Sequence, residues 1–393
     1  MTAASDILTD IGAEDAIARH QQENETPVRR LLLTPASQIR IRPVRWLWDT
    51  TPDGEPPTSH GRIPMNSLAI AAGGAGLGKS QYAVWLAAQV TRGTLPGELS
   101  GTPRGVIYAA TEDSWTHTIA PRLVAAGADL DRVYRVEVRD DCAPRARLTL
   151  PVDTALIGQA AEEYGIALVV ADPLLSMIDR RINDYRAAEV REALEPLVEA
   201  ADRYSFTILG LAHFTKSGAA DPLNRVAGSG AFGQIVRSVI AFADQQTDNG
   251  VAERVMSVVK NNLGRLGLPS HTYAIEPVTV DTDEGPSYVS RFALGEETTT
   301  TVREVMREEA MPEPHKEETN DTVKWLRGYL ADHGGAADAA KVKSAARQED
   351  ISLSTLHRAR ARLKLLVQTR GFGPDKVSRW ALPGTTAASG GKE

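Results

Sequence analysis

The sequence predicts an α/β protein with a mostly parallel sheet and a small, separate helical module near its C-terminal end. Three observations support this prediction. Short apolar segments alternate with helical segments over residues 67–280, which is typical of a parallel sheet covered by helices on both faces. A glycine-rich loop joins the first strand to the first helix. Residues 321–383 have a helical pattern of their own and the opposite charge to the rest of the chain.

Length and composition fit a globular protein. The chain has 393 residues, 42% of them hydrophobic and 24% charged, enough for one large core and a smaller module. No run of about 18 apolar residues and no basic-then-apolar leader is present, so we expect neither a membrane partner nor secretion. Cys142 is the only cysteine, which excludes an internal disulfide and a cysteine-based zinc site and favours a reducing cytoplasm.

The first strand and helix flank a phosphate-binding motif. Residues 73–80 read G-x-x-x-x-G-K-S between an apolar strand (67–72) and a helical segment (81–91). Glycines let successive backbone N–H groups point at phosphates, and a helix N-terminus attracts the same anion. Lys79 would neutralise the β- and γ-phosphates of ATP, and Ser80 would ligate Mg²⁺. The alternative is a glycine-rich turn. The expected nucleotide-binding residues are Gly73, Gly74, Ala75, Gly76, Leu77, Gly78, Lys79, Ser80, Gln81 and Lys260.

Three further strands end in polar residues that suit a triphosphate site. Glu112 follows the second apolar strand, expected beside the phosphate loop, where a carboxylate can polarise the attacking water. Asp172 closes an apolar strand in a Walker B pattern and would hold Mg²⁺. His213 ends another strand and could sense the γ-phosphate. Structural roles are the alternatives, with Asp113 or Ser114 as a helix cap.

The remaining elements follow from apolar periodicity. The last three strands of the core follow one another without long helices, so we expect one side of the sheet to be antiparallel. Trp46 and Trp48 are interpreted as buried anchors in preference to a base-stacking platform. The expected strands are 67–72, 105–110, 133–138, 166–171, 206–212, 238–243, 255–261 and 271–275, and the expected helices are 81–91, 114–126, 153–164 and 187–204.

Phosphoryl transfer of this type also needs a cation at the γ-phosphate, often supplied by a neighbouring subunit. Arg237, Arg254 and Lys260 are the candidates, and a shared site would require an oligomer. Two loops that contain glycines or cations could in addition bind a nucleic-acid backbone. The alternative is that their charged side chains are only solvated and bind nothing. Their cations are Arg180, Arg181, Lys216 and Arg225.

The end of the chain has a different character. We expect a leader at 1–35, a core at 36–295, a poorly ordered linker at 296–320 and a frayed tail at 384–393. Residues 321–383 carry 12 Lys and Arg against 6 Asp and Glu, a charge of +6, so the remainder carries −13.

Residues 321–383 are interpreted as a winged helix-turn-helix. Helices are expected at 322–332, from Asp338 to about 347 and from Ser352 to 364, before a two-stranded wing. On the third helix, apolar residues would form the core stripe while polar ones contact DNA. Such domains also bind proteins, and the charge favours DNA. The stripe is Leu353, Leu356, Ala359 and Leu363, and the opposite face is Thr355, Arg358 and Arg362.

These motifs resemble RecA-like hexameric helicases, most closely the RepA-like plasmid and phage replication helicases. The resemblance covers residues 44–264. It rests on the following stretches: Arg45-Trp46-Leu47-Trp48, Arg62-Ile63-Pro64, residues 73–80, Thr111-Glu112-Asp113-Ser114, Val169-Val170-Ala171-Asp172-Pro173-Leu174, Ala212-His213-Phe214-Thr215-Lys216, Gly228-Ser229-Gly230-Ala231-Phe232 and Val259-Lys260-Asn261-Asn262.

The resemblance implies a RecA-like P-loop ATPase that uses ATP and Mg²⁺. It implies Glu112 as catalytic base, His213 as phosphate sensor and Arg237 as the finger of a neighbouring subunit. DnaB-like relatives have Lys-x-Arg where this chain has Lys260-Asn261-Asn262, so Lys260 becomes an auxiliary cation. The resemblance also implies a ring-forming, hexameric DNA helicase or translocase of plasmid or phage replication that hydrolyses ATP, with other replication proteins as expected partners. The alternatives are a DNA-stimulated recombinase mediator or loader and a nucleotide-gated DNA-binding regulator.

Overall fold

The computed structural model describes residues 31–140, 143–183, 186–215, 219–226, 232, 234–246, 252–310, 313–370 and 377–383. It divides the chain into two compact units, residues 1–43 and 44–393. The described part of the first unit contains the short helix η1 (Ala36–Gln38), which has no buried residue. The expected tail lies outside the described residues, as does the expected leader except for 31–35.

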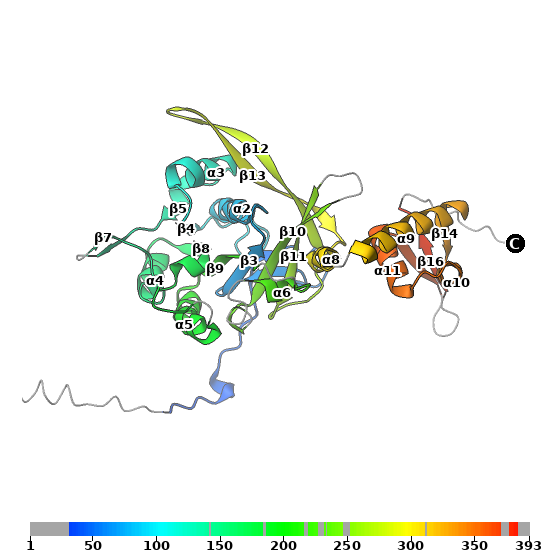
Figure 1. The fold of residues 1–393 in the computed structure, drawn as a ribbon. Helices are drawn as coiled ribbons and strands as arrows, with labels where there is room; N and C mark the ends of the chain where they lie inside the picture. The colour runs from blue at the N-terminus through cyan, green and yellow to red at the C-terminus, as the bar shows by residue number, and fades with distance from the viewer. Residues whose placement is uncertain are drawn as a thin grey trace, which may run out of the picture. The chain divides into compact units, whose positions relative to one another are not determined.

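A large mixed sheet forms the centre of the second unit. Six neighbouring strands, from β10 to β5, run parallel, and the other three pair antiparallel beside β10 (Figure 1). The prediction of a mostly parallel sheet with one antiparallel side is therefore confirmed. Among the described residues the sheet has nine strands, in the order β13 (Gly285–Thr298), β12 (Ser270–Thr282), β11 (Ala252–Asn261), β10 (Ser238–Gln246), β3 (Leu68–Gly73), β9 (Thr207–His213), β8 (Ile166–Asp172), β4 (Gly105–Ala110) and β5 (Val133–Arg135).

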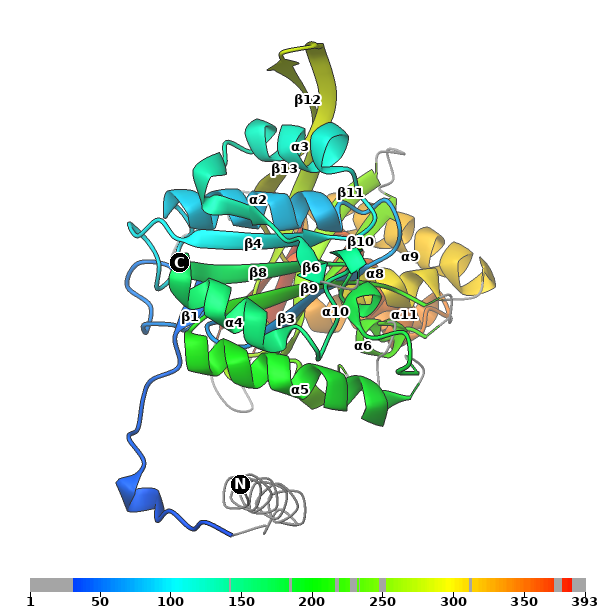
Figure 2. The same ribbon diagram turned by 90° about the vertical axis from the view of Figure 1, so that its left-hand side faces the viewer.

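Helices cover both faces of the parallel strands, as Figure 2 shows. One face carries α2 (Lys79–Arg92) and α3 (Ala120–Ala125), which follows the π-helical turn η2 (Trp115–Ile119). The other face carries α4 (Thr154–Glu163) and α5 (Ala187–Tyr204). Because strand side chains alternate between faces, each face has its own buried apolar cluster. Other short helices of the core within the described residues include η3 (Leu130–Arg132), η4 (Leu174–Met177) and α6 (Pro222–Arg225).

Two small sheets stand beside the large one. Strands β1 (Trp46–Asp49) and β2 (Gly61–Pro64) pair antiparallel and bury Trp46 and Trp48, which are 3% and 1% exposed. The interpretation of these tryptophans as buried anchors is confirmed. Strands β6 (Val138–Asp140) and β7 (Ala143–Ala146) form a second hairpin. The single strand expected at 133–138 is thus divided: β5 is paired only with β4, and Val138 begins the hairpin.

Residues 296–310 do not form a poorly ordered linker, so that expectation is wrong. Strand β13 continues to Thr298, and helix α8 (Val302–Glu309) follows. Thr301 and Glu304 form a capping box at the start of α8, and Val302, Val305 and Met306 are buried in the core. The sequence held this signal, because a Thr-x-x-Glu followed by apolar residues at helical spacing marks a helix start.

The C-terminal module has three helices and a three-stranded antiparallel sheet within its described residues. Asp338 and Ser352 cap the second and third helices through their side chains, as predicted. The first helix begins at Glu313, earlier than expected, and β14 was not predicted. The elements are α9 (Glu313–Asp332), β14 (Ala336–Asp338), α10 (Ala339–Gln348), α11 (Leu353–Arg362), β15 (Leu366–Arg370) and β16 (Val377–Ala381), with sheet order β14-β16-β15.

Helix α11 places most of its residues as expected. Leu356, Ala359 and Leu363 are buried in the module's core, whereas Leu353, in the first turn, is 39% exposed. Thr355 does not lie on the solvent face: it is 1% exposed, and its hydroxyl lies 2.8 Å from that of the cap Ser352. The Thr355 side chain therefore takes part in capping α11 and does not face solvent, contrary to the prediction that it would contact DNA.

No helix among the described residues has the length and apolar character needed to cross a bilayer.

Candidate active site

Four neighbouring parallel strands bring the predicted site residues to one edge of the sheet. The strands β3, β9, β8 and β4 are adjacent, and the carboxyl ends of parallel strands share an edge. Gly73 pairs with His213, and Ala110 pairs with Asp172. Strand β4 is not the neighbour of β3 as expected, because β9 and β8 lie between them. Glu112 nevertheless follows β4 at this same edge.

The phosphate loop has the backbone that its glycines allow. Gly76 and Gly78 have φ angles of 75° and 86°, in the left-handed region that other residues rarely adopt. A side chain at Gly78 would also place its Cβ 2.6 Å from Ile275. The backbone conformation therefore favours glycine at position 78, and a side chain there would also require the end of Ile275 to move. Helix α2 begins directly after it at Lys79.

Lys79 is a buried cation at the centre of the site. Its Nζ donates to the carbonyls of Gly73, at 3.0 Å, and Gly74, at 2.7 Å, and lies 3.4 Å from His213 Nδ1. Desolvation by burial lowers the pKa of Lys79 to about 8, and the charge of Asp172 opposes that shift. A negatively charged phosphate would reverse the shift, because it would stabilise the ammonium form.

Asp172 lies between the loop and β4. The hydroxyl of Tyr108 donates to its carboxylate at 3.2 Å, and Ser80 also hydrogen-bonds to it. Burial raises the pKa of Asp172; the two hydrogen bonds lower it, and the charges of Asp113 and Glu112 raise it. The serine hydroxyl and the carboxylate therefore face each other, the arrangement expected of a Mg²⁺ site completed by water and phosphate oxygens.

No group of three or more His, Cys, Asp or Glu side chains suited to a metal ion occurs among the described residues. A metal in this site would therefore need ligands from a substrate. Ser80 and Asp172 fit that requirement, since Mg²⁺ in phosphoryl-transfer sites keeps several waters and few protein ligands.

Glu112 and His213 complete the edge. The Glu112 side chain is exposed, which leaves it accessible to water. Burial lowers the pKa of His213 and the nearby charge of Lys79 lowers it further, while Glu112 and Asp172 raise it, so these groups act on one another electrostatically. Ser114 caps η2 by accepting from the amide of His117, at 3.3 Å, and Asp113 pairs with Arg122 at 3.1 Å. Asp113 and Ser114 therefore have structural roles, and Glu112 is the acid of this segment that is available to contact the attacking water.

Strand β12, which the sequence did not connect with the site, supports the phosphate loop. The hydroxyl of Tyr273 donates to the carbonyl of Leu77 at 2.6 Å, and Ile275 lies against Gly78. Gln81 Nε2 donates to Ser290 Oγ in β13 at 3.0 Å, so this expected nucleotide-binding side chain contacts the hairpin instead. Figure 1 shows the β12–β13 hairpin passing beside α2. Pairings over such long sequence separations leave no local signal.

The candidate cations from the end of the core separate into two groups. The amide of Arg237 donates to the carbonyl of Leu68 at the start of β3, five residues before Gly73. At about 3.3 Å per residue, that is roughly 16 Å from the phosphate loop. Lys260 lies at the same end, with Nζ donating to the carbonyl of Val236 at 2.7 Å. Arg254 lies at the phosphate-loop end instead, opposite Asp244.

Lys260 therefore does not reach the phosphate loop of its own chain, contrary to its assignment as a nucleotide-binding residue. Burial lowers its pKa, and the neighbouring Arg237 lowers it further. The two cations form one positive group at the amino ends of the strands. Only the site of another subunit could use them.

The loop cations differ in how available they are. Arg180 and Arg181 are exposed, although Arg181 pairs with Asp179 at 2.5 Å and thereby lowers the pKa of that carboxyl to about 2. Arg225 is not a loop cation: its guanidinium lies 5.5 Å from the centre of the Phe214 ring and pairs with Glu309 at 3.8 Å. Its assignment to nucleic acid is not supported by this geometry.

The other expected nucleic-acid contacts lie elsewhere in the chain. Lys216 and residues 227–231 lie outside the described residues. In the C-terminal module, Arg358 donates to the hydroxyl of Thr355 at 2.9 Å, and Arg362 hydrogen-bonds Asn320 of α9. Both arginines are half-buried.

The sheet order, the glycine loop and the acids at neighbouring strand ends fit a P-loop NTPase with a RecA-like core. A family model described as an AAA domain matches residues 25–219. The matched residues contain the loop, Glu112, Asp172 and His213, and the match supports a RecA-like P-loop ATPase.

Comparisons with individual proteins add little. No curated protein matches the sequence. Among solved structures, a KaiC-like protein from the archaeon Pyrococcus horikoshii is similar over 63% of this chain and 99% of its own, with 16% identity and a TM-score of 0.43. That similarity is too distant to carry an argument about activity.

We expect ATP binding to weaken as pH rises through about 8, the pKa of Lys79, because the ammonium loses its proton there. Bound phosphate should restore the charged form, so ATP binding above this pH takes up a proton. Calorimetry at about pH 8.5 in two buffers of different ionisation enthalpy measures that uptake. Lys79→Ala should abolish it, and equal uptake by parent and variant would contradict the assignment.

The same pKa has an effect on stability of opposite sign. The pKa of Lys79 in the folded protein lies below the ordinary lysine value of 10.5, so between about pH 8 and 10.5 the unfolded chain binds more protons. The contribution of Lys79 to the free energy of unfolding should therefore increase with pH over that window.

Tyr273→Phe should weaken ATP binding about fivefold, because one hydrogen bond that orients the loop is worth about 1 kcal/mol. The rate of hydrolysis at saturating ATP should change little. The matched control is Tyr288→Phe in the same hairpin, where the side chain is 82% exposed. Titration with a fluorescent ATP analogue measures both affinities, and equal values for the two variants would refute the role of Tyr273.

Proposed function

We propose that this protein is an ATP-dependent DNA helicase or translocase of plasmid or phage replication, working as a ring, with a hexamer as the expected form. The observation that carries the proposal is the convergence of Lys79, Glu112, Asp172 and His213 at the edge formed by β3, β9, β8 and β4. These groups have the charges that binding and hydrolysis of a triphosphate require.

Each side chain has a part in the proposed reaction. Lys79 binds the β- and γ-phosphates, and the N-terminus of α2 supports the same anion. Ser80 and Asp172 would hold Mg²⁺, which when bound neutralises charge that develops on the phosphates. Glu112 accepts the proton of the attacking water. His213, 3.4 Å from Lys79, is positioned to respond when the γ-phosphate leaves.

The position of the missing cation supports the proposed ring. Arg237 and Lys260 lie together at the amino ends of the strands, away from the phosphate loop of the same chain. An arginine there could act only on a nucleotide bound by a neighbouring subunit. A head-to-tail contact of this kind closes into a ring when its rotation permits.

The expected nucleic-acid contacts are Arg180 and Arg181 in the core and Arg358 and Arg362 in the C-terminal module. The module's charge of +6 favours a polyanion, and we interpret its helices and antiparallel sheet as a winged helix-turn-helix. We infer that it helps to recruit the protein to DNA or to other replication proteins in the cytoplasm.

The same charge also fits two alternative functions. In a recombinase mediator or loader the ATPase would be stimulated by DNA without unwinding, and in a nucleotide-gated regulator the C-terminal module would supply sequence specificity. Unwinding of a forked duplex distinguishes the helicase from both.

Glu112→Gln should lower ATP hydrolysis by a factor of about 10² to 10⁴, because the water loses its base, while ATP affinity changes little. Phosphate release measured with and without single-stranded DNA tests this. Asp113→Asn, which alters the adjacent acid, is the matched control and should retain most activity. Unchanged hydrolysis by Glu112→Gln would exclude the mechanism.

Arg237→Ala should lower turnover by about 10³ and leave ATP binding intact, since the guanidinium would act across a subunit boundary. Mixing this variant with Lys79→Ala chains should restore part of the activity, because some interfaces then combine an intact loop with an intact arginine. Hydrolysis measured over a range of mixing ratios makes the test. If no mixture exceeds the two separate variants, Arg237 is not a shared residue.

A further inference from the structure

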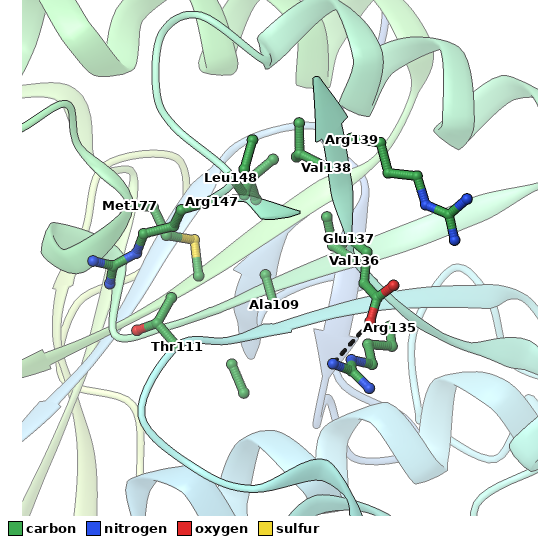
Figure 3. Close-up of a pocket in the computed structure, with 12 residues that line it drawn as sticks. Ala109, Thr111, Arg135, Val136, Glu137, Val138, Arg139, Arg147, Leu148 and Met177 are labelled. Atoms are coloured by element: carbon green, nitrogen blue, oxygen red, sulfur yellow. Dashed lines mark ion pairs between the residues drawn. The ribbon is translucent and has the colours of Figure 1, made fainter. Parts of the chain in front are cut away.

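A cavity of about 620 Å³ opens at the carboxyl end of β4, beside the site but separate from the phosphate loop. Its walls come from β4, from the segment that joins β5 to β6, and from β7 and the residues after it (Figure 3). None of residues 73–81 lines it. The cavity is therefore distinct from the phosphate-binding loop.

The rim of the cavity is cationic. Arg135, Arg139 and Arg147 line it with a single carboxylate, Glu137, which pairs with Arg135 at 2.8 Å. Within the part of the chain that the structure describes, neither guanidinium group of Arg139 and Arg147 has a hydrogen bond or ion pair, although the Arg147 carbonyl accepts one from the Thr149 hydroxyl at 2.8 Å. Figure 3 shows the guanidinium groups of these two residues on different sides of the cavity. In a chain of net charge −7, such a cavity would attract an anion.

The floor of the cavity is apolar. Ala109 and Met177 are buried in the cluster on the α4 and α5 face, and Leu148 packs against the same cluster. Val138 lines the cavity near Arg139. Apolar surface below a guanidinium rim suits a ligand with a flat ring at one end and phosphate at the other, because arginine binds phosphate bidentately and also stacks on bases. The volume is within the range of small-molecule sites.

The cavity is connected to the catalytic edge through one residue. Thr111 lines it, and the Thr111 amide donates to the carbonyl of Asp172 at 3.0 Å. Glu112 is the next residue in the chain. A ligand that contacts Thr111 would therefore touch the segment that carries the proposed catalytic base.

We propose that this cavity binds a nucleotide unit, with its phosphate at the arginine rim and its base on the floor formed by Leu148 and Met177. Two kinds of ligand contain such a nucleotide unit. Single-stranded DNA is one, and this source rests on the proposed function. A free nucleoside phosphate is the other.

The test compares two double variants that each remove two positive charges. Arg139→Ala with Arg147→Ala alters the cavity. Arg203→Ala with Arg265→Ala is the matched control, because both arginines are exposed and neither lines the cavity. Thermal unfolding by circular dichroism establishes that both variants are folded, which is expected because all four side chains are exposed.

The first arm measures binding of a fluorescent oligothymidylate. The cavity variant should bind about tenfold more weakly, which corresponds to about 1.4 kcal/mol, and the control should change less than about twofold. The second arm measures ADP binding in a Lys79→Ala background, in which the phosphate loop is disabled. Loss of ADP binding that is confined to the cavity variant identifies a free nucleotide as the ligand.

Equal behaviour of the two double variants in both arms overturns the proposal, because the arginines then contribute only general charge. The two hypotheses fail separately. If the parent protein does not bind oligothymidylate, the DNA-dependent function is wrong, and the ADP arm still decides whether the cavity binds a nucleotide. Absence of ADP binding to Lys79→Ala would then refute the cavity site as well.

Discussion

The buried ammonium of Lys79 is the interaction on which the site depends. Two loop carbonyls, His213 and the field of Asp172 surround this cation, and each of these groups stands at the carboxyl end of a parallel strand or directly after one. Burial makes the charge costly, so the cluster of compensating groups must form together with the sheet. A bound phosphate would supply the opposite charge that the protein supplies only in part. The order of the parallel strands therefore determines which groups surround the buried Lys79 ammonium.

The antiparallel side of the sheet shares in that constraint. Strand β12 contacts Leu77 through Tyr273 and places Ile275 close to Gly78, and β13 contacts Gln81. The loop thus has supports on both sides, from the parallel strands and from the hairpin. Rigid supports of this kind favour catalysis, because a preorganised site does not have to reorganise during the reaction.

Cations are distributed between two ends of the same strands. The phosphate loop, Lys79 and Arg254 lie at one end, while Arg237 and Lys260 lie at the other. The proposed enzyme is therefore incomplete as a single chain, and assembly would place the end with the second cation group against a neighbour's nucleotide. The cationic cavity beside β4 would add a site at which a nucleic acid or a nucleotide could influence the same edge.

The sequence by itself determined most of the strands and helices between β3 and β12, the glycine loop and the polar residues at the strand ends, because these depend on local patterns of apolar residues and on chain conformation. Only the tertiary structure decided that β9 and β8 separate β3 from β4, that Arg225 is occupied by Phe214 and Glu309, and that Tyr273 supports the loop. It also replaced the expected linker at 296–310 by a strand and a helix. Strand order and side-chain partners depend on contacts between residues far apart in the chain. A local sequence pattern does not indicate which distant residue will make each contact.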